Sequence, residues 1–483
     1  MNRKFITNLA FLLFLNFLVK PFYILGIDAE IQNRVGAEDY GMYFSLLGFT
    51  FLFTIFLDVG IVNFTTRTIS QQPFLIQKYF SKVFSLRIFL ALIYGVLVLI
   101  IGGIIGYNQS EIYLLLWLIF NQILAGFTLY FRSNLTGLLL FKYDSIVSVL
   151  DRFLLIIICS ILLWGGVTTE PFQIYWFVYA QTFAYGVSAI TALIFLLSNQ
   201  KLKKLNWDKL FSMAILRQSA PYALLILLMT FYYRADSVML ERMLEDGKTQ
   251  AGIYANGFRF FEAANNIAFL FATLLLPLFS NLLKNKKPVA SLVKIASSIL
   301  IPGAILVAIT CFLFSQQLID ARYINSTFQS GQVFGILMIC FVFISTTYIF
   351  GTLLTANGNL KTLNKIAFGG VVLNIILNLI LIPKYQAYGA AIASLITQGL
   401  TTIAQVWLCK SYFNLKMNSS LITRGFIFTA ICLALGVILN QEYFNFIPWY
   451  GLMAILFFSG ILFLFVLQIV EIKNVKKLFQ KTS

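Results

Sequence analysis

The sequence predicts an all-α integral membrane protein with about fourteen transmembrane helices. Of its 483 residues, 60% are hydrophobic and only 11% are charged, and the mean hydropathy is +0.86. The chain contains a series of apolar runs, and most of them have a length close to the roughly 20 residues that cross a bilayer core. Basic residues gather in every second connection between these runs, which is the pattern of a polytopic membrane protein.

Each predicted span is an apolar run bounded by charged or turn-forming residues. The first run begins like a signal peptide, but it is as long as a full span and no small-residue cleavage pattern follows it. We therefore expect a retained first helix. The predicted spans are 5–27, 40–63, 83–106, 111–131, 146–165, 174–197, 218–240, 253–277, 289–314, 331–355, 364–382, 389–409, 425–440 and 448–470.

The basic residues sort to one side when the N-terminus is placed in the cytoplasm. On that assignment 27 of the 35 basic residues lie in cytoplasmic segments, and Arg132, Lys142 and Arg152 form one of these groups. Because positive charge favours the cytoplasmic side, both termini are predicted to be cytoplasmic. The five basic residues on the outer side are Arg34, Arg242, Lys248, Arg322 and Lys384.

The remaining three basic residues, Lys20, Arg234 and Arg259, lie inside predicted spans. At a rise of 1.5 Å per residue they share one depth, roughly 10 Å below the outer surface. A charged side chain near mid-bilayer costs about 2.5–3.5 kcal/mol, so such residues usually face a bundle interior or a wet cavity. These three cations are predicted to bind an anionic substrate.

Polar residues accompany these cations at helical spacing. Arg234 shares a face with Thr230, Ser237 and Glu241, and Arg259 shares one with Asn256, Glu262 and Asn266. Asn16 lies one turn before Lys20. Asn16, Asn256 and Asn266 are predicted to contact substrate, and Asp236 and Glu262 to couple transport to an ion.

Less specific interpretations of these residues stay open. Arg234 and Arg259 could snorkel to the outer interface, and Glu262 could simply neutralise Arg259 one turn away. Single polar residues in membrane helices most often form interhelical hydrogen bonds.

Several function classes are excluded or disfavoured. The chain has no histidine, which excludes His-ligated metals and His-based acid/base catalysis. Its five cysteines lie in apolar spans without paired spacing, so no disulfide framework is expected. We expect no metal and no cofactor. The net charge of +17 follows from the topology rather than from nucleic-acid binding. No connection exceeds about twenty residues, too short for a catalytic domain, so an enzyme is not expected.

An internal repeat divides the chain. The pattern G-x4-G-x-Y occurs at Gly36, Gly41 and Tyr43 and again at Gly247, Gly252 and Tyr254, an offset of 211. A second pair, Gly137 with Leu139 and Leu140 against Gly351 with Leu353 and Leu354, recurs at an offset of 214. Two six-helix units in the same orientation are therefore predicted, related by an axis along the membrane normal. The predicted domains are 1–200, 201–412, and 413–483 with two extra helices and a basic tail.

Five segments together resemble polysaccharide-export flippases of the Wzx type, in the multidrug, oligosaccharidyl-lipid and polysaccharide exporter superfamily, whose fold is that of the MATE transporters. They are R-V-G-A-E-D-Y-G-M-Y (Arg34 to Tyr43), L-D-V-G (Leu57 to Gly60), Y-R-A-D-S-V-M-L (Tyr233 to Leu240), G-I-Y-A-N-G-F-R-F-F-E (Gly252 to Glu262) and N-L-I-L-I-P-K-Y-Q-A-Y-G-A-A-I-A (Asn378 to Ala393). The resemblance runs from the first to the twelfth predicted helix.

The resemblance implies two six-helix bundles in a V shape with a central cationic cavity. It also implies transport of undecaprenyl-pyrophosphate-linked oligosaccharide repeat units, such as those of O-antigen lipopolysaccharide, across the bacterial inner membrane by ion-coupled alternating access. Expected partners are this lipid-linked oligosaccharide, a proton or sodium ion, membrane lipids and the polysaccharide polymerase machinery. Arg34 and Asp58 fall in the motifs and are expected to gate or to shape turns. Alternatives are a multidrug or peptidoglycan-precursor exporter of the same superfamily, or, from another class, a membrane polysaccharide polymerase.

Overall fold

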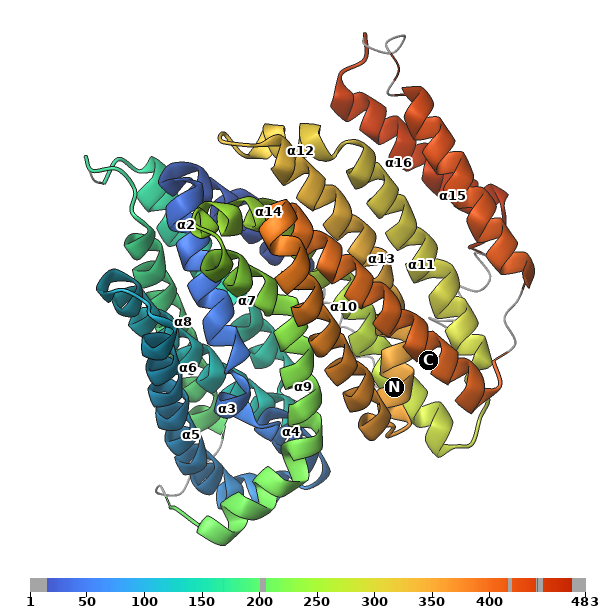
Figure 1. The fold of residues 1–483 in the computed structure, drawn as a ribbon. Helices are drawn as coiled ribbons and strands as arrows, with labels where there is room; N and C mark the ends of the chain where they lie inside the picture. Colours follow the sequence, from blue (N-terminus) through green and yellow to red (C-terminus); the bar gives the residue numbers. More distant parts are fainter. Residues whose placement is uncertain are drawn as a thin grey trace. The chain divides into compact units, whose positions relative to one another are not determined.

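The computed structural model describes residues 15–167, 169–199, 206–415, 419–439, 441 and 446–470. The predicted N-terminal basic pair Arg3 and Lys4, the group Lys201, Lys203 and Lys204, and the basic tail beyond residue 470 lie outside these ranges. The described chain is helical and contains no strand (Figure 1). Its elements are the π-helix η1 (Tyr23–Asp28), α2 (Ala29–Leu52), α3 (Ile55–Asp58), α4 (Ile61–Gln71), η2 (Pro73–Leu75), α5 (Ile76–Ile105), α6 (Gln109–Gly137), α7 (Phe141–Trp164), α8 (Ile174–Asn199), α9 (Lys209–Met243), α10 (Gly247–Lys284), α11 (Ala290–Leu313), α12 (Ser315–Arg322), α13 (Phe328–Ala356), α14 (Leu360–Phe413), α15 (Ser419–Leu439) and α16 (Trp449–Val466).

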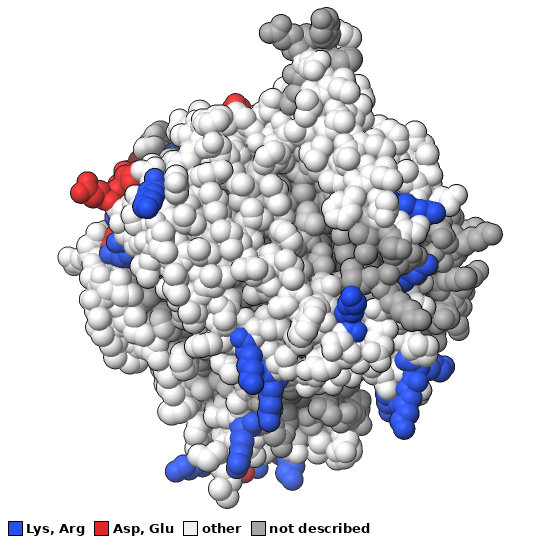
Figure 2. All heavy atoms as spheres, turned by 45° about the vertical axis from the view of Figure 1, so that its right-hand side comes forward, with Lys and Arg blue, Asp and Glu red and all other residues white. Residues whose placement is uncertain are grey.

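The predicted all-α membrane class is confirmed. Within the described ranges, ten helical segments are long and apolar enough to cross a bilayer, and the shorter apolar segment Thr423–Leu439 adds to them. Figure 2 shows a face on which most of the described surface carries no charge, as expected where lipid tails contact protein.

The second predicted span, 40–63, is wrong as a single helix. α2 ends at Leu52, and Val59 and Gly60 adopt left-handed backbone angles of φ 44° and 78° before α4 begins. Gly60 permits this turn because it has no Cβ. The Asp58 carboxylate accepts the Val62 N–H at 3.2 Å and so satisfies one of the free donors at the start of α4. The hydrophobic sequence therefore continues while the backbone turns, and Val59 and Gly60 form that turn.

The chain forms two compact units, residues 2–252 and 253–483. In the first unit α9 packs along α2, and α6 packs against α4 and α8. In the second unit α13 packs against α11 and α14, while α15 and α16 pack on α11. α14 contains a break at Gln386, where φ is 52°, between the eleventh and twelfth predicted spans. The domain boundary at 200/201 stays a prediction about the repeat.

Within the first unit, the backbones of α2 and of the start of α10 are in direct contact. A Cβ placed on Gly41 would lie 1.8 Å from the Lys248 carbonyl oxygen, and one on Gly252 would lie 2.1 Å from the Ala37 carbonyl oxygen. The contact is reciprocal, because the offset of 211 that relates Gly41 to Gly252 also relates Ala37 to Lys248. Such reciprocity is what a twofold repeat would produce.

We predict that Gly41→Ala and Gly252→Ala each destabilise the protein by about 1–3 kcal/mol, because the added methyl group has to displace backbone. Thermal unfolding of the purified protein in detergent measures the loss. The matched control is Gly186→Ala in α8, where an added Cβ meets no atom within 4 Å. Equal melting temperatures for all three variants would contradict the close approach.

Candidate functional site

Lys20 lies in the helical segment that leads into η1. Pro21 follows it directly and has no N–H to donate, which disturbs the regular α-helical ladder, and the next turn is the π-helix Tyr23–Asp28. Lys20 is half-buried. π-helical turns are rare and often occur at functional sites. This part of the first helix is therefore a candidate functional site.

Two contacts join the first helix to α7 on either side of Lys20. The Asn16 amide donates to the Ser148 hydroxyl at 3.2 Å. Further along both helices, the Arg152 guanidinium lies over the Tyr23 ring at 4.8 Å. Because Asn16, Lys20 and Tyr23 share one helix face, Lys20 is directed toward the same side of α7 as Arg152.

Arg152 is a functional candidate that sequence reasoning missed. The sequence analysis grouped it with the cytoplasmic charges, but it lies well inside α7 and its side chain is 29% exposed. It donates to the Tyr185 hydroxyl of α8 at 3.1 Å, lies over that ring at 5.7 Å, and pairs with Asp151 at 3.7 Å. The sequence did contain a signal for this residue, because Arg152 is a charged residue inside the apolar run 146–165.

These residues form a cationic group within the first unit, which we call the Lys20–Arg152 cluster. It carries two cations, Lys20 and Arg152, and one carboxylate, Asp151. The members of the cluster are Asn16, Lys20, Tyr23, Ser148, Asp151, Arg152 and Tyr185.

Other buried polar groups of the first unit are tied together by tyrosines. The Tyr40 hydroxyl donates to Asp28 of η1 at 2.7 Å, and Asp28 is only 1% exposed. The Gln181 amide of α8 donates to the Tyr43 hydroxyl at 2.7 Å. Asp28 was not singled out by sequence reasoning, although it ends the first apolar run.

The polar face predicted on α9 packs against α2. Glu241 accepts a hydrogen bond from Ser45 at 3.2 Å, Ser237 lies against Gly48, and the Arg234 guanidinium lies over the Phe51 ring at 4.6 Å. Arg234 is therefore half-buried beside an aromatic ring. Asp236, on the same helix, is 1% exposed.

The predicted residues of α10 lie in the second unit. Arg259 pairs with Glu262 at 2.7 Å one turn away, and the Arg259 side chain is only 8% exposed. The Asn256 amide donates to Ser330 of α13 at 3.3 Å, which is an interhelical hydrogen bond. Asn266 is half-buried. Arg259 therefore has a close carboxylate neighbour on its own helix.

Arg34 and Asp58 occupy different environments. Arg34 is exposed on α2 and pairs with Glu30 at 3.3 Å. Asp58 accepts a hydrogen bond from Arg87 at 2.6 Å, and Arg87, whose side chain is 3% exposed, also donates to the Gly126 carbonyl of α6 at 2.9 Å. Asp58 thus neutralises a buried arginine that links three helices.

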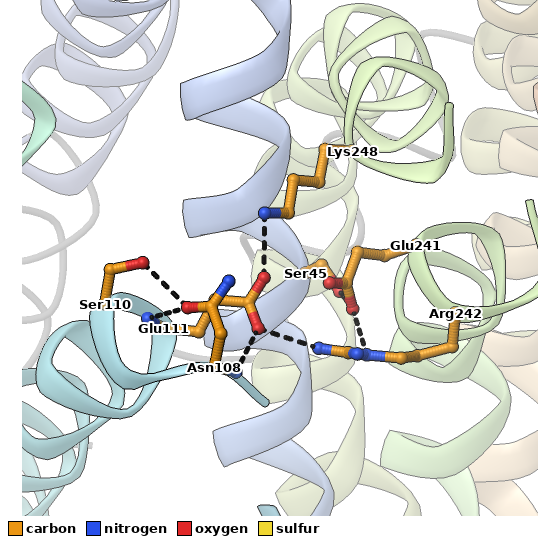
Figure 3. A network of polar contacts seen from close by, with 7 residues as sticks. All are labelled: Ser45, Asn108, Ser110, Glu111, Glu241, Arg242 and Lys248. Carbon is orange, nitrogen blue, oxygen red and sulfur yellow. Dashed lines mark hydrogen bonds and ion pairs between the residues drawn. The ribbon is translucent and has the colours of Figure 1, made fainter. Parts of the chain in front are cut away.

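A second charge network fastens the turn between α9 and α10 to α6 (Figure 3). Glu111 pairs with Lys248 at 2.8 Å and with Arg242 at 3.3 Å, and Arg242 also pairs with Glu241 at 2.9 Å. Glu111 and Asn108 form a reciprocal cap at the start of α6.

The sequence analysis placed Arg242 and Lys248 in an outer connection but assigned them no partner. Arg242 lies 3.8 Å from the centre of the Tyr107 ring. Burial, followed by the nearby Glu241 charge, raises the pKa of the Tyr107 phenol well above its usual range. This phenol therefore stays neutral, and the charge network is carried by the carboxylates and the two cations.

A family model for polysaccharide biosynthesis proteins matches residues 6–283, more than half of the chain. The chain belongs to the polysaccharide biosynthesis protein family. Over 387 residues, 75% of this chain and 88% of the relative, this family member is 25% identical to an uncharacterized membrane protein of Methanocaldococcus jannaschii.

Solved structures share the fold of this polysaccharide biosynthesis protein. The lipid II flippase MurJ in an inward closed conformation aligns with a TM-score of 0.73 and 15% identity, over 95% of this chain and 97% of that one. An inward-facing multidrug resistance MATE transporter of the MOP superfamily aligns with a TM-score of 0.60 and 15% identity, over 81% of this chain and 95% of that one. The predicted family resemblance and the predicted fold are confirmed.

We predict that Asp58→Asn destabilises this polysaccharide biosynthesis protein by about 3 kcal/mol, because it leaves the buried Arg87 without its counter-charge. This is the lower end of the range for a buried pair, since Asp58 is 29% exposed. Arg34→Gln, which breaks an exposed pair, should cost less than about 1 kcal/mol. Denaturation of both purified variants in detergent measures the two losses of stability. A loss for Asp58→Asn as small as that for Arg34→Gln would rule out a structural role for Asp58.

We predict that Glu111→Gln lowers stability by about 1–3 kcal/mol, because it removes the charge that holds Arg242 and Lys248 but can keep the cap on α6. A double-mutant cycle with Lys248→Met isolates the pair. A coupling energy near zero, measured by thermal unfolding at low salt, would show that the pair contributes nothing to stability.

Proposed function

We propose that this protein moves undecaprenyl-pyrophosphate-linked oligosaccharide repeat units across the bacterial inner membrane for the synthesis of a surface polysaccharide such as O-antigen lipopolysaccharide. The observation that carries the proposal is that a member of the polysaccharide biosynthesis family places the guanidinium groups of Arg152 and Arg234 over aromatic rings inside its helices. A pyrophosphate needs guanidinium or ammonium partners where water is scarce. Lys20, Arg234 and Arg259 are the proposed anion-binding cations, with Asn16, Asn256 and Asn266 facing the sugar hydroxyls.

The described contacts rank these cations. Arg259 already pairs with Glu262 at 2.7 Å, which weakens its pull on a second anion. The Arg234 guanidinium lies over Phe51. Lys20 lies on the first helix between two contacts with α7, those of Asn16 with Ser148 and of Tyr23 with Arg152. Lys20 is therefore proposed to contribute more to binding than Arg259.

Ion coupling is proposed for Glu262 and Asp236, with a proton or a sodium ion as the coupling ion. Glu262 is 22% exposed and is held by Arg259, so protonation of Glu262 would release this arginine for substrate. Both termini are proposed to be cytoplasmic, and the polysaccharide polymerase machinery is the proposed partner that receives the product.

Two other substrates are weighed against this one. A multidrug exporter binding organic cations would need an acidic site, whereas the predicted spans hold Lys20, Arg234 and Arg259 at one depth. Lipid II is the nearer alternative, because a lipid II flippase shares the fold over 95% of this chain.

The test is flipping of a fluorescent polyprenyl-pyrophosphate oligosaccharide in proteoliposomes. We expect wild type to flip it, Lys20→Gln and Arg234→Ala to lower the rate at least tenfold, and Arg259→Ala to lower it less, since its charge is already paired. The matched control is Lys142→Gln, which removes an exposed cation at the start of α7. Faster flipping of labelled lipid II would favour that substrate, and no flipping of either lipid by folded wild type would reject the proposal.

A further inference from the structure

Three buried or half-buried arginines of the first unit are held in different ways. The Arg87 side chain is sealed, at 3% exposed, and bonds to Asp58 at 2.6 Å. Arg132 pairs with Asp144 at 2.7 Å across the α6–α7 connection. Among the residues that the structure describes, Arg152 pairs with one carboxylate, that of Asp151 at 3.7 Å, and the rings of Tyr23 and Tyr185 provide further contacts. Arg87 and Arg132 are thus neutralised within the fold, and Arg152 is held without being fully neutralised.

The position of Lys20 beside Arg152 adds a second uncompensated charge. Two like charges repel one another, and the repulsion is stronger where little water separates them. Asp151 offsets part of this repulsion, and the Lys20–Arg152 cluster keeps a net positive charge. A dianion placed between the two cations would turn the repulsion into attraction.

The geometry of Arg152 suits an anionic ligand. Within the described part of the chain its contacts use Nη1, which donates to Tyr185, and Nε, which faces Asp151. Nη2 keeps donors for a ligand, since a guanidinium carries five N–H groups. The rings of Tyr23 and Tyr185, 4.8 and 5.7 Å from the guanidinium carbon, restrict its motion, which lowers the entropy lost on binding. At 29% exposed, the side chain is also reachable.

We propose that Lys20 and Arg152 together bind the pyrophosphate of the lipid-linked substrate, with Asn16 and Tyr185 orienting them. This inference rests on the proposed function and adds a residue of α7 that no motif indicated. Arg152 supplies planar donors and Lys20 a mobile point charge. The head group thereby acquires two binding residues within the first unit, Lys20 of the first helix and Arg152 of α7, with Tyr185 of α8 holding Arg152.

The experiment measures equilibrium binding of labelled polyprenyl pyrophosphate to the full-length protein in lipid nanodiscs, with neutral polyprenol as a second ligand. We expect Arg152→Gln and Lys20→Gln each to weaken pyrophosphate binding about 10- to 100-fold, the loss typical of one charged hydrogen bond. Binding of polyprenol should not change. Arg152→Lys keeps the charge but not the planar fork and should fall between wild type and Arg152→Gln.

Lys142→Gln, on the same helix but exposed, is the matched control and should bind like wild type. Folded Arg152→Gln and Lys20→Gln proteins that bind pyrophosphate like wild type would overturn the proposal. An equal loss of polyprenol binding would also overturn it, because Arg152 would then act on the fold. Displacement of the labelled lipid by excess inorganic pyrophosphate would support head-group recognition, whereas tighter binding of inorganic pyrophosphate than of the lipid would assign the site to a soluble anion.

The two proposals fail separately. If wild type binds polyprenyl pyrophosphate through Arg152 but flips no lipid-linked oligosaccharide, the transport proposal fails and the anion site stands. If wild type flips the lipid and the folded Arg152→Gln and Lys20→Gln variants bind it unchanged, the anion site fails and the transport proposal stands.

Discussion

The contact on which the first unit most depends is the backbone approach of α2 and α10 at Gly41 and Gly252. Lipid tails are as apolar as leucine, so burial of apolar side chains does little to join membrane helices, and close van der Waals packing between small residues does more. Because no side chain separates the two backbones, the start of α10 is fixed against α2. That position brings Lys248 within 2.8 Å of Glu111 and, through the short turn before α10, holds α9 along α2.

The buried charges follow from the cost of placing an ion where water is scarce. Arg87 and Arg259 are neutralised by carboxylates at 2.6 and 2.7 Å, and such pairs stabilise a fold at the expense of reactivity toward a ligand. Arg152 is instead placed over the rings of Tyr23 and Tyr185, which attract a cation without cancelling its charge. A cation held in this way can attract an anionic ligand more strongly than a neutralised one.

Much of the fold could be predicted from the sequence, because long apolar runs and sorted charges determine which segments cross a bilayer. The break at Val59 and Gly60 was missed, since hydropathy is insensitive to a turn inside an apolar run. Lys20 and Arg234 could be proposed as binding residues because the sequence alone shows a charge inside an apolar run. The contacts of α9 and of Arg152 could not be predicted, because they join residues more than a hundred positions apart, such as Tyr23 and Arg152.

The reciprocal contact of Gly41 with Lys248 and of Gly252 with Ala37 also bears on ancestry. Two identical subunits that meet across a twofold axis make each contact twice, once in each direction. A half-length ancestor with one copy of G-x4-G-x-Y would have made this contact with a second copy of itself, as a homodimer. Gene fusion would then have converted a concentration-dependent association into a permanent one. After such a fusion the two copies would have been free to diverge.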